Sequence, residues 1–156
     1  MHSNNIPIYN KNDFQKMHQA GRLAATILDQ LYTLIKPGIS TLEINDFCHD
    51  LIIKNNAIPA PLNYKGFPKS VCTSVNHVVC HGIPNEKKLL NNGDIINVDV
   101  TVILDGWYGD SSRMFVAGKP NKKNLDLLKT TYECLQIGIK EAKPGKTFGD
   151  IGFQIQ

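Results

Sequence analysis

The sequence predicts an α/β fold of the α+β kind, in which antiparallel hairpins are covered by helices. Residues 95–104 are rich in Val and Ile, as a buried strand is, and Asp105-Gly106 directly after them is a strong hairpin-turn signal. Stretches before and after this hairpin place apolar residues at intervals of three and four, which predicts amphipathic helices. The 156 residues, 42% hydrophobic and 20% charged, suffice for one globular domain with a core.

Composition and charge exclude several classes of partner. The net charge of +3 is too small to favour nucleic acid or a membrane surface. No apolar run is long enough to span a bilayer, and MHSNNIPIYN lacks the apolar core of a signal peptide, so we expect a cytoplasmic protein. The absence of CxxC spacing favours reduced, mostly buried thiols over a zinc or redox motif at Cys48, Cys72, Cys80 and Cys134.

Two helices are expected before the hairpin. The first spans residues 12–35, with Asn12 as its N-cap, and Lys36-Pro37-Gly38 ends it. Its apolar stripe consists of Phe14, Met17, Gly21, Ala24, Leu28, Leu31 and Ile35. Ser40 and Glu43 form a capping box that starts the second helix. The predicted buried face of that helix consists of Ile44, Phe47, Cys48, Leu51 and Ile52.

A proline-rich loop separates the second helix from the first expected strands. This loop also contains the aromatic pair Tyr64 and Phe67. Strands are expected near residues 70–75 and 78–81, with a turn at Asn76-His77 between them. If that turn has two residues, Cys72 lies directly opposite His81.

The hairpin around Asp105-Gly106 carries two aspartates where a strand does not need them. With a two-residue turn, Asp99 lies opposite Ser112 and Asp110 lies opposite Thr101. Because side chains alternate between the faces of a strand, both aspartates share one face, with Cα atoms about 7–8 Å apart. Carboxylates so placed can hold two metal ions about 3.5–4 Å apart. The alternative is a solvent-facing side of the hairpin, although Asp is a poor residue for strand interiors.

The end of the chain repeats an earlier part of it. A third helix is expected after Pro120-Asn121, with an apolar face of Leu125, Leu128, Tyr132, Leu135, Ile139 and Ala142. Residues 143–151 then repeat residues 36–44 at an offset of 107, although the shared KPG is also a common helix stop. A genuine repeat makes residues 1–156 a single truncated domain. Its first half would be about 10–120, and the start of its second half about 121–156.

Two motifs resemble the amino-terminal half of type I methionine aminopeptidases. They are NYKGFPKSVCTSVNHVVCHGIPN at 63–85 and NNGDIINVDVTVILDGWYGDSSRMFVAGKP at 91–120, and the resemblance covers essentially all of residues 10–156. It implies the pita-bread (creatinase/aminopeptidase-like) fold, which has two similar halves related by a pseudo-twofold axis. This chain would then contain the first pseudo-symmetric half plus the start of the second, in agreement with the repeat.

The resemblance also implies site residues. Asp99 and Asp110 match the two aspartates that bind metal in this family, whose other ligands, a histidine and two glutamates, come from the second half. His81 matches the catalytic, substrate-binding histidine that contacts the scissile amide. The family residues that line the pocket for the methionine side chain correspond to Tyr64, Phe67 and Cys72. Without the motif, His81 would be read as a loop histidine and the other three as ordinary core residues.

The implied function is that of a metal-dependent aminopeptidase, a hydrolase that removes the initiator methionine when the second residue is small. Its cofactors would be divalent cations, two per full site, drawn from cobalt, manganese, iron and zinc. Its partners would be the N-terminal methionine of nascent polypeptides and the ribosome, and a full-length member is expected to be a monomer. Because the second-half ligands do not occur in these 156 residues, we expect little or no activity from this chain alone.

Three alternatives remain open at the level of sequence. A pita-bread relative without a metal site could act as a non-catalytic binding module, and a truncated copy could be a decayed gene product. A proline-specific pita-bread peptidase is the third. The intact Asp99, Asp110 and His81 favour catalysis, and the HGIP segment favours the methionine enzyme.

Overall fold

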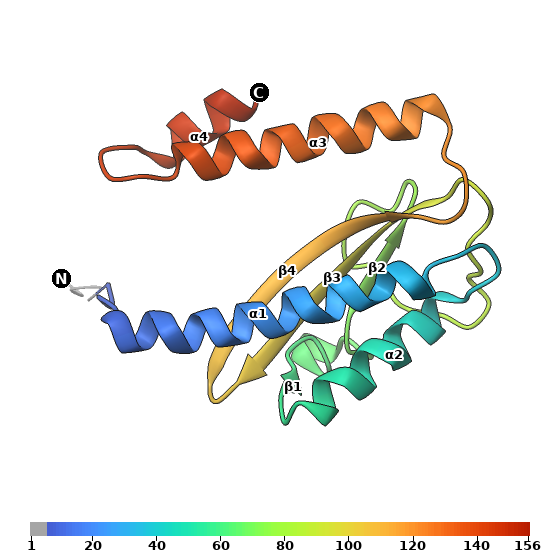
Figure 1. Cartoon of the computed structure of the whole chain (residues 1–156), viewed down its shortest axis with the longest axis horizontal. Helices are drawn as coiled ribbons and strands as arrows, with labels where there is room; N and C mark the ends of the chain where they lie inside the picture. Colours follow the sequence, from blue (N-terminus) through green and yellow to red (C-terminus); the bar gives the residue numbers. More distant parts are fainter. Residues whose placement is uncertain (1–5) are drawn as a thin grey trace. The chain divides into compact units, whose positions relative to one another are not determined.

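The computed structural model describes residues 6–156, which fall into two compact units (Figure 1). The first unit, which ends at Gly118, contains α1 (Lys11–Leu34), α2 (Thr41–Lys54), β1 (Ile58–Pro59), the 3₁₀ turn η1 (Tyr64–Gly66), β2 (Cys72–Val75), β3 (Ile95–Leu104) and β4 (Trp107–Val116). The second unit, Lys119–Gln156, contains α3 (Lys122–Glu141) and α4 (Phe148–Ile155).

The four strands form one antiparallel sheet with β3 in its middle. On one edge β3 pairs with β4, and on the other it pairs with β1 near one end and with β2 near the other. The predicted register is confirmed, since Asp99 lies opposite Ser112 and Asp110 lies opposite Thr101. The turn residues Asp105 and Gly106 have φ of 50° and 81°, as a two-residue hairpin turn requires.

Helices α1 and α2 cover one face of this sheet (Figure 1). Val98, Val100 and Val102 of β3 are fully buried and join one core cluster with the apolar faces of both helices. The helical members of the cluster include Ala24, Ile27, Leu28, Leu31, Ile44, Cys48 and Ile52. Alternation along β3 leaves Asp99 and Thr101 on the opposite face, where both are only partly buried.

The N-cap of α1 lies two residues earlier than the sequence predicts. Its N-cap is Asn10, whose side chain accepts hydrogen bonds from the amides of Asn12 (2.8 Å) and Asp13 (3.3 Å). The Asp13 carboxylate accepts a bond from the Asn10 amide at 2.9 Å. The prediction of Asn12 as the cap was wrong because Asp13 completes a capping box with Asn10. The first residue of the predicted apolar stripe is not buried, since Phe14 is 57% exposed.

The strand predicted at residues 78–81 does not form. The turn at Asn76-His77 is present, because the Val78 amide donates to the Val75 carbonyl at 3.1 Å. The chain then bulges and meets β2 again at Gly82, whose carbonyl accepts a bond from the Thr73 amide at 2.8 Å. Cys72 is therefore not opposite His81. It pairs with Asp99 of β3 and is the first residue of β2, so the strand is shorter than the predicted 70–75.

The two-residue strand β1 was not predicted, because Pro59 argues against a strand in a sequence pattern. It lies at an edge of the sheet, which is where proline is tolerated. The Ala60 amide, just after it, donates to the Thr101 carbonyl at 3.0 Å. This contact fixes the start of the proline-rich loop against β3.

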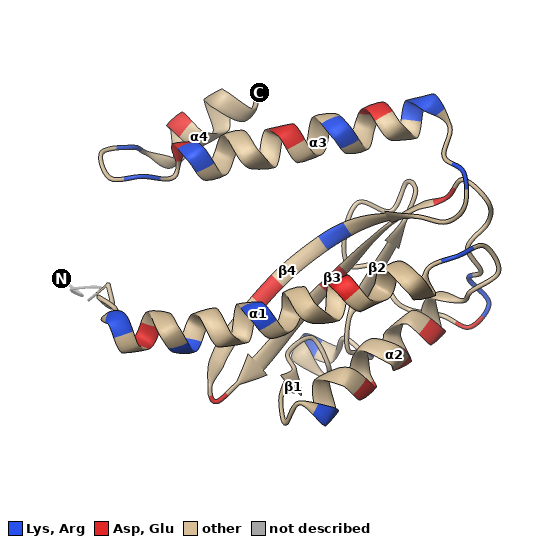
Figure 2. Cartoon of the chain, in the orientation of Figure 1, with Lys and Arg blue, Asp and Glu red and all other residues tan. Residues whose placement is uncertain are grey.

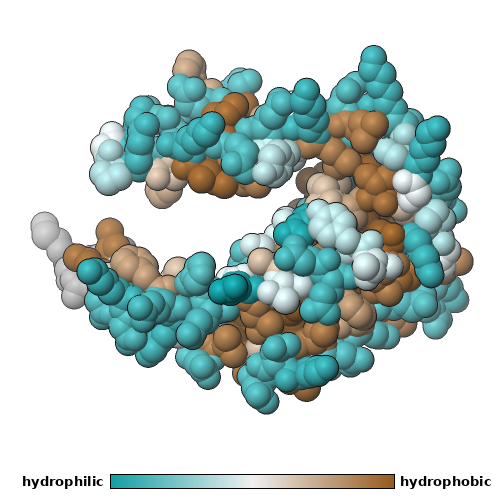
Figure 3. All heavy atoms as spheres, in the orientation of Figure 1, coloured by the Kyte–Doolittle hydropathy of each residue, from teal (hydrophilic) through white to brown (hydrophobic). Residues whose placement is uncertain are grey.

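The second unit repeats the local structure of the α1–α2 connection. Gly38 and Gly145 have φ of 93° and 86°, and capping boxes follow at Ser40–Glu43 and at Thr147–Asp150. The expected apolar face of α3 is largely exposed at Leu125, Tyr132, Leu135 and Ile139. Figure 3 shows apolar atoms gathered over α3 and α4.

The charged side chains are mixed rather than segregated. Lys or Arg and Asp or Glu intersperse along α1 and along α3 (Figure 2). Among residues 6–156, no helix combines the length and the apolar character needed to cross a bilayer.

Candidate functional site

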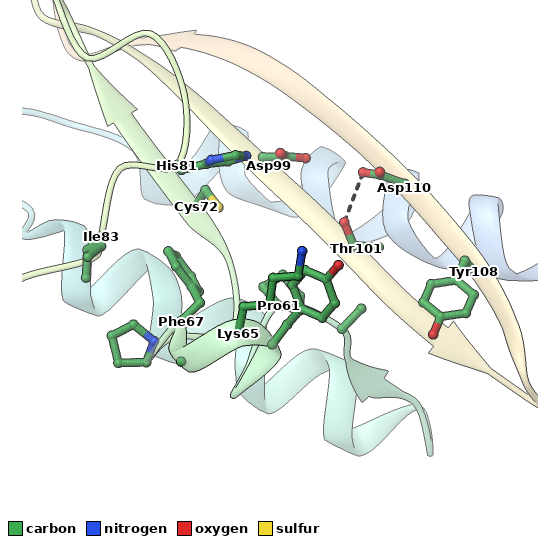
Figure 4. Close-up of a pocket in the computed structure, with 14 residues that line it drawn as sticks. Pro61, Lys65, Phe67, Cys72, His81, Ile83, Asp99, Thr101, Tyr108 and Asp110 are labelled. Carbon is green, nitrogen blue, oxygen red and sulfur yellow. Dashed lines mark hydrogen bonds between the residues drawn. The ribbon is translucent and has the colours of Figure 1, made fainter.

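A pocket of about 850 Å³ lies on the face of the sheet opposite the buried valines (Figure 4). This volume is typical of sites that enclose a small molecule or a peptide side chain. The pocket is lined by all six residues that the sequence singles out: Tyr64, Phe67, Cys72, His81, Asp99 and Asp110. The fold thus brings these residues together, and the role of each stays a prediction.

Two carboxylates face each other at one end of the pocket. Asp99 comes from β3 and Asp110 from β4, and Figure 4 shows their side chains turned toward one another. Thr101 donates a hydrogen bond to Oδ1 of Asp110 at 3.0 Å. Burial raises the pKa of Asp99, and the neighbouring Asp110 raises it further. A divalent cation between the two carboxylates would relieve this repulsion.

The aspartate pair fits a divalent metal in the type of its donors but not in their number. Carboxylate oxygens are common ligands of manganese, iron, cobalt and zinc. Over the part of the chain that the structure describes, however, no three His, Cys, Asp or Glu residues are grouped so as to hold a metal ion. Because such sites normally use three or four protein ligands, Asp99 and Asp110 could supply only part of a ligand set.

His81 lies beside the carboxylates on the bulged segment after β2. Its backbone is left-handed, with φ of 54°, which is uncommon for a residue with a side chain. Figure 4 shows its imidazole directed toward Asp99. The imidazole lowers the pKa of Asp99, against the larger effects of burial and of Asp110. His81 can therefore donate a hydrogen bond to a group held between itself and the aspartates.

Away from the carboxylates the pocket wall is apolar and includes Phe67 and Ile83. The thiol of Cys72 lies nearer the carboxylates, because Cys72 pairs with Asp99 across the β2–β3 ladder (Figure 4). Burial raises the pKa of Cys72 to about 11, with further contributions from Asp99, Cys80 and Asp110. The thiol is therefore protonated at neutral pH and acts as a small apolar surface rather than as a nucleophile.

The loop that forms this wall is tied to α2. Oδ1 of Asn45 accepts a hydrogen bond from the Ser70 amide at 2.8 Å. Nδ1 of His49 lies 2.8 Å from Oγ of Ser70. Ser70 and Asn45 are both buried. Since Ser70 lies two residues before Cys72, the first residue of β2, these bonds set the position of the loop relative to that strand.

Of the further lining residues that the sequence did not assign to the site, three have polar side chains: Lys65, Thr101 and Tyr108. Thr101 and Tyr108 lie two residues from Asp99 and Asp110 along their strands, so alternation alone could have identified them. Lys65 has φ of 48° and holds its Nζ 5.5 Å from the Tyr64 ring centroid. No sequence pattern signals this left-handed lysine.

The sequence profile of metallopeptidase family M24 matches residues 15–156. The chain belongs to this family. Membership implies a divalent metal cofactor, and the donor chemistry of Asp99 and Asp110 agrees with one.

Relatives of this M24 chain are named methionine aminopeptidases. One from Rickettsia prowazekii is 57% identical over 151 residues, which are 97% of this chain and 58% of the relative. One from Escherichia coli is 48% identical over 152 residues, again 97% of this chain and 58% of the relative. The M24 chain thus spans less than two thirds of the length of these relatives. The expected resemblance to this kind of protein is confirmed.

Solved structures confirm the pita-bread fold. A crystal structure of the Rickettsia prowazekii methionine aminopeptidase has a TM-score of 0.94 at 57% identity, over 97% of this chain and 60% of that one. The Thermotoga maritima methionine aminopeptidase has a TM-score of 0.92 at 32% identity, over 97% and 61%. A Pyrococcus furiosus prolidase, at 20% identity, has a TM-score of 0.79 over 95% and 42%, a likeness of fold alone.

Proposed function

We propose that this M24 chain supplies the first half of the active site of a methionine aminopeptidase. The pocket carries the proposal, because two facing carboxylates and an imidazole lie at one end of it and an apolar wall lies at the other. Such a pocket matches a substrate with a free amine and a reacting amide beside an apolar side chain. Relatives named methionine aminopeptidases, at 57% and 48% identity, support the same assignment.

In this proposal Asp99 and Asp110 hold divalent metal, with two ions in a full site and cobalt, manganese, iron and zinc as candidates. Such ions lower the pKa of water and polarise a carbonyl. The chain's own contribution is to hold the two carboxylates in one place, through the β3–β4 register and the bond from Thr101 to Asp110. Further ligands are needed for tight binding, so we propose weak metal binding and little activity for this chain alone.

The other residues are proposed to bind and orient the peptide. The unbranched thioether of methionine would lie against Tyr64, Phe67 and Cys72, where a charged side chain would lose its hydration. His81 would donate a hydrogen bond to the scissile amide, whose oxygen gains negative charge during hydrolysis. Steric limits beyond the methionine would restrict the second residue to a small one.

The proposed substrate indicates where in the cell the reaction would take place. Nascent polypeptides with a free N-terminal methionine occur in the cytoplasm beside the ribosome, and we propose that the protein acts there. A full-length protein of this kind is proposed to act as a monomer, with no membrane and no specific nucleic acid as partner.

A chimera tests this proposal. This chain would replace the matched segment of the Rickettsia prowazekii methionine aminopeptidase, with which it is 57% identical over 151 residues. With added Co²⁺ or Mn²⁺, the chimera should release methionine from a Met-Ala-Ser peptide. His81→Ala should lower kcat by on the order of 100-fold or more, and Asp99→Ala or Asp110→Ala should abolish release.

Asp126→Ala, at an exposed position of α3, is the control and should leave the rate unchanged. The unmodified 156-residue chain should release little methionine. A folded chimera that is inactive with either metal, or one that keeps its rate after Asp99→Ala, would contradict the proposal. Strong release by the 156-residue chain alone would contradict the proposed need for further ligands.

A further inference from the structure

The segment that presents His81 is held to β2 at Gly82, the next residue. The Gly82 carbonyl accepts a hydrogen bond from the Thr73 amide at 2.8 Å, and the Gly82 amide donates to Oγ of Ser74 at 3.2 Å. A Cβ atom on residue 82 would lie 2.1 Å from the Thr73 carbonyl oxygen. The backbone therefore approaches β2 as closely as only glycine permits.

This attachment matters because the residue before it is strained. His81 has φ of 54°, and Val79, two residues earlier, is 91% exposed and contributes little packing. A left-handed histidine persists only when its surroundings hold it there. The backbone bond from Thr73 and the side-chain bond to Ser74 are the two contacts that fix Gly82 to the outer edge of β2.

Ser74 is placed for this task by the strand. It is 4% exposed and pairs with Asn97 of β3, two residues from the Cys72–Asp99 pair. Alternation puts its side chain on the same face of the sheet as Cys72 and the aspartates. Its hydroxyl thus links the β3 register, which places Asp99, to the segment that places His81.

We infer that Ser74 is a positioning residue, which holds the His81 imidazole toward the aspartate pair through its hydrogen bond with the Gly82 amide. The inference rests on the proposed function for the meaning of that position. Loss of the Ser74 hydroxyl, which accepts this bond, would let residue 81 leave the left-handed conformation. The imidazole would then turn away from Asp99, while the aspartates themselves stay in place.

NMR of the 156-residue chain tests this with Ser74→Ala, Ser74→Thr and Thr73→Val. Thr73→Val is the matched control, because the neighbouring Thr73 hydroxyl is buried and has no hydrogen-bond partner among the described residues. In Ser74→Ala, hydrogen exchange of the Gly82 amide should be about fivefold faster. With Mn²⁺ as a paramagnetic probe at the aspartates, relaxation of the His81 ring protons should fall several-fold.

Ser74→Thr keeps the hydroxyl and should restore both values, and Thr73→Val should leave both unchanged. Ser74→Cys, whose sulfur is a weaker acceptor, should give intermediate values and decides the question if Ser74→Ala does not fold. Unchanged Gly82 exchange and His81 relaxation in Ser74→Ala, or equal changes in Thr73→Val, would overturn the inference. If Mn²⁺ broadens no Asp99 or Asp110 resonance, the proposed metal site is wrong. The role of Ser74 is then tested by the hydrogen exchange of the Gly82 amide, measured without metal.

Discussion

At the scale of the residue, Asp99 links the candidate site to stability. Burial, and then the charge of Asp110, raise its pKa above the ordinary value of 3.8. The carboxylate of Asp99 therefore binds a proton more tightly in the folded state than in the unfolded state. Protonation of Asp99 stabilises the folded state, and this stabilisation is complete below the ordinary pKa and is lost as the pH rises through the raised pKa. We expect Asp99→Asn to raise the urea midpoint of unfolding at pH 7, with the gain shrinking toward pH 3.8.

Asp105→Asn is the matched control for this prediction, because it makes the same chemical change at an exposed turn residue. Asn tolerates the positive φ of that position, so little change in the midpoint is expected at any pH. A gain in Asp99→Asn that persists in acid would show that packing, and not ionisation, is responsible.

At the scale of the element, α1 and the β3–β4 hairpin meet at Gly109. A Cβ atom there would lie 2.2 Å from the backbone carbon of Ala20, which is itself fully buried. Gly109 directly precedes Asp110, so separating the two elements would also displace that carboxylate. We expect Gly109→Ala to lower the free energy of unfolding by about 1–3 kcal/mol, measured by urea denaturation.

Gly21→Ala, on α1 at the same contact, is expected to change the stability in the opposite direction. Its added methyl group would meet no atom within 4 Å, and alanine is the better helix former. This change should raise the free energy of unfolding by up to about 1 kcal/mol. Similar destabilisation by both substitutions would argue against close backbone approach as the cause.

The elements also differ in how far the sequence could predict them. The β3–β4 register followed from a two-residue turn and strict alternation, which are local rules, and it placed Asp99 and Asp110 correctly. The segment around His81 did not follow, because its position depends on bonds from Thr73 and Ser74 that no local pattern encodes. The capping box of α1 was missed by two residues for a local reason, the competition between Asn10 and Asn12.

At the scale of the whole molecule, the strongest expectation comes from the apolar surface of α3 and α4. Leu135, Ile139 and Phe153 are 54%, 58% and 77% exposed, and Phe148 is 94% exposed. Apolar side chains in such numbers favour association, since each buried leucine contributes about 2 kcal/mol. The 156-residue chain should therefore self-associate as its concentration rises in sedimentation velocity.

Leu135→Lys should weaken the association by about tenfold or more, whereas Thr130→Lys, at an exposed polar position of the same helix, should not. A chain that sediments as a monomer up to millimolar concentration would show that this surface is not adhesive.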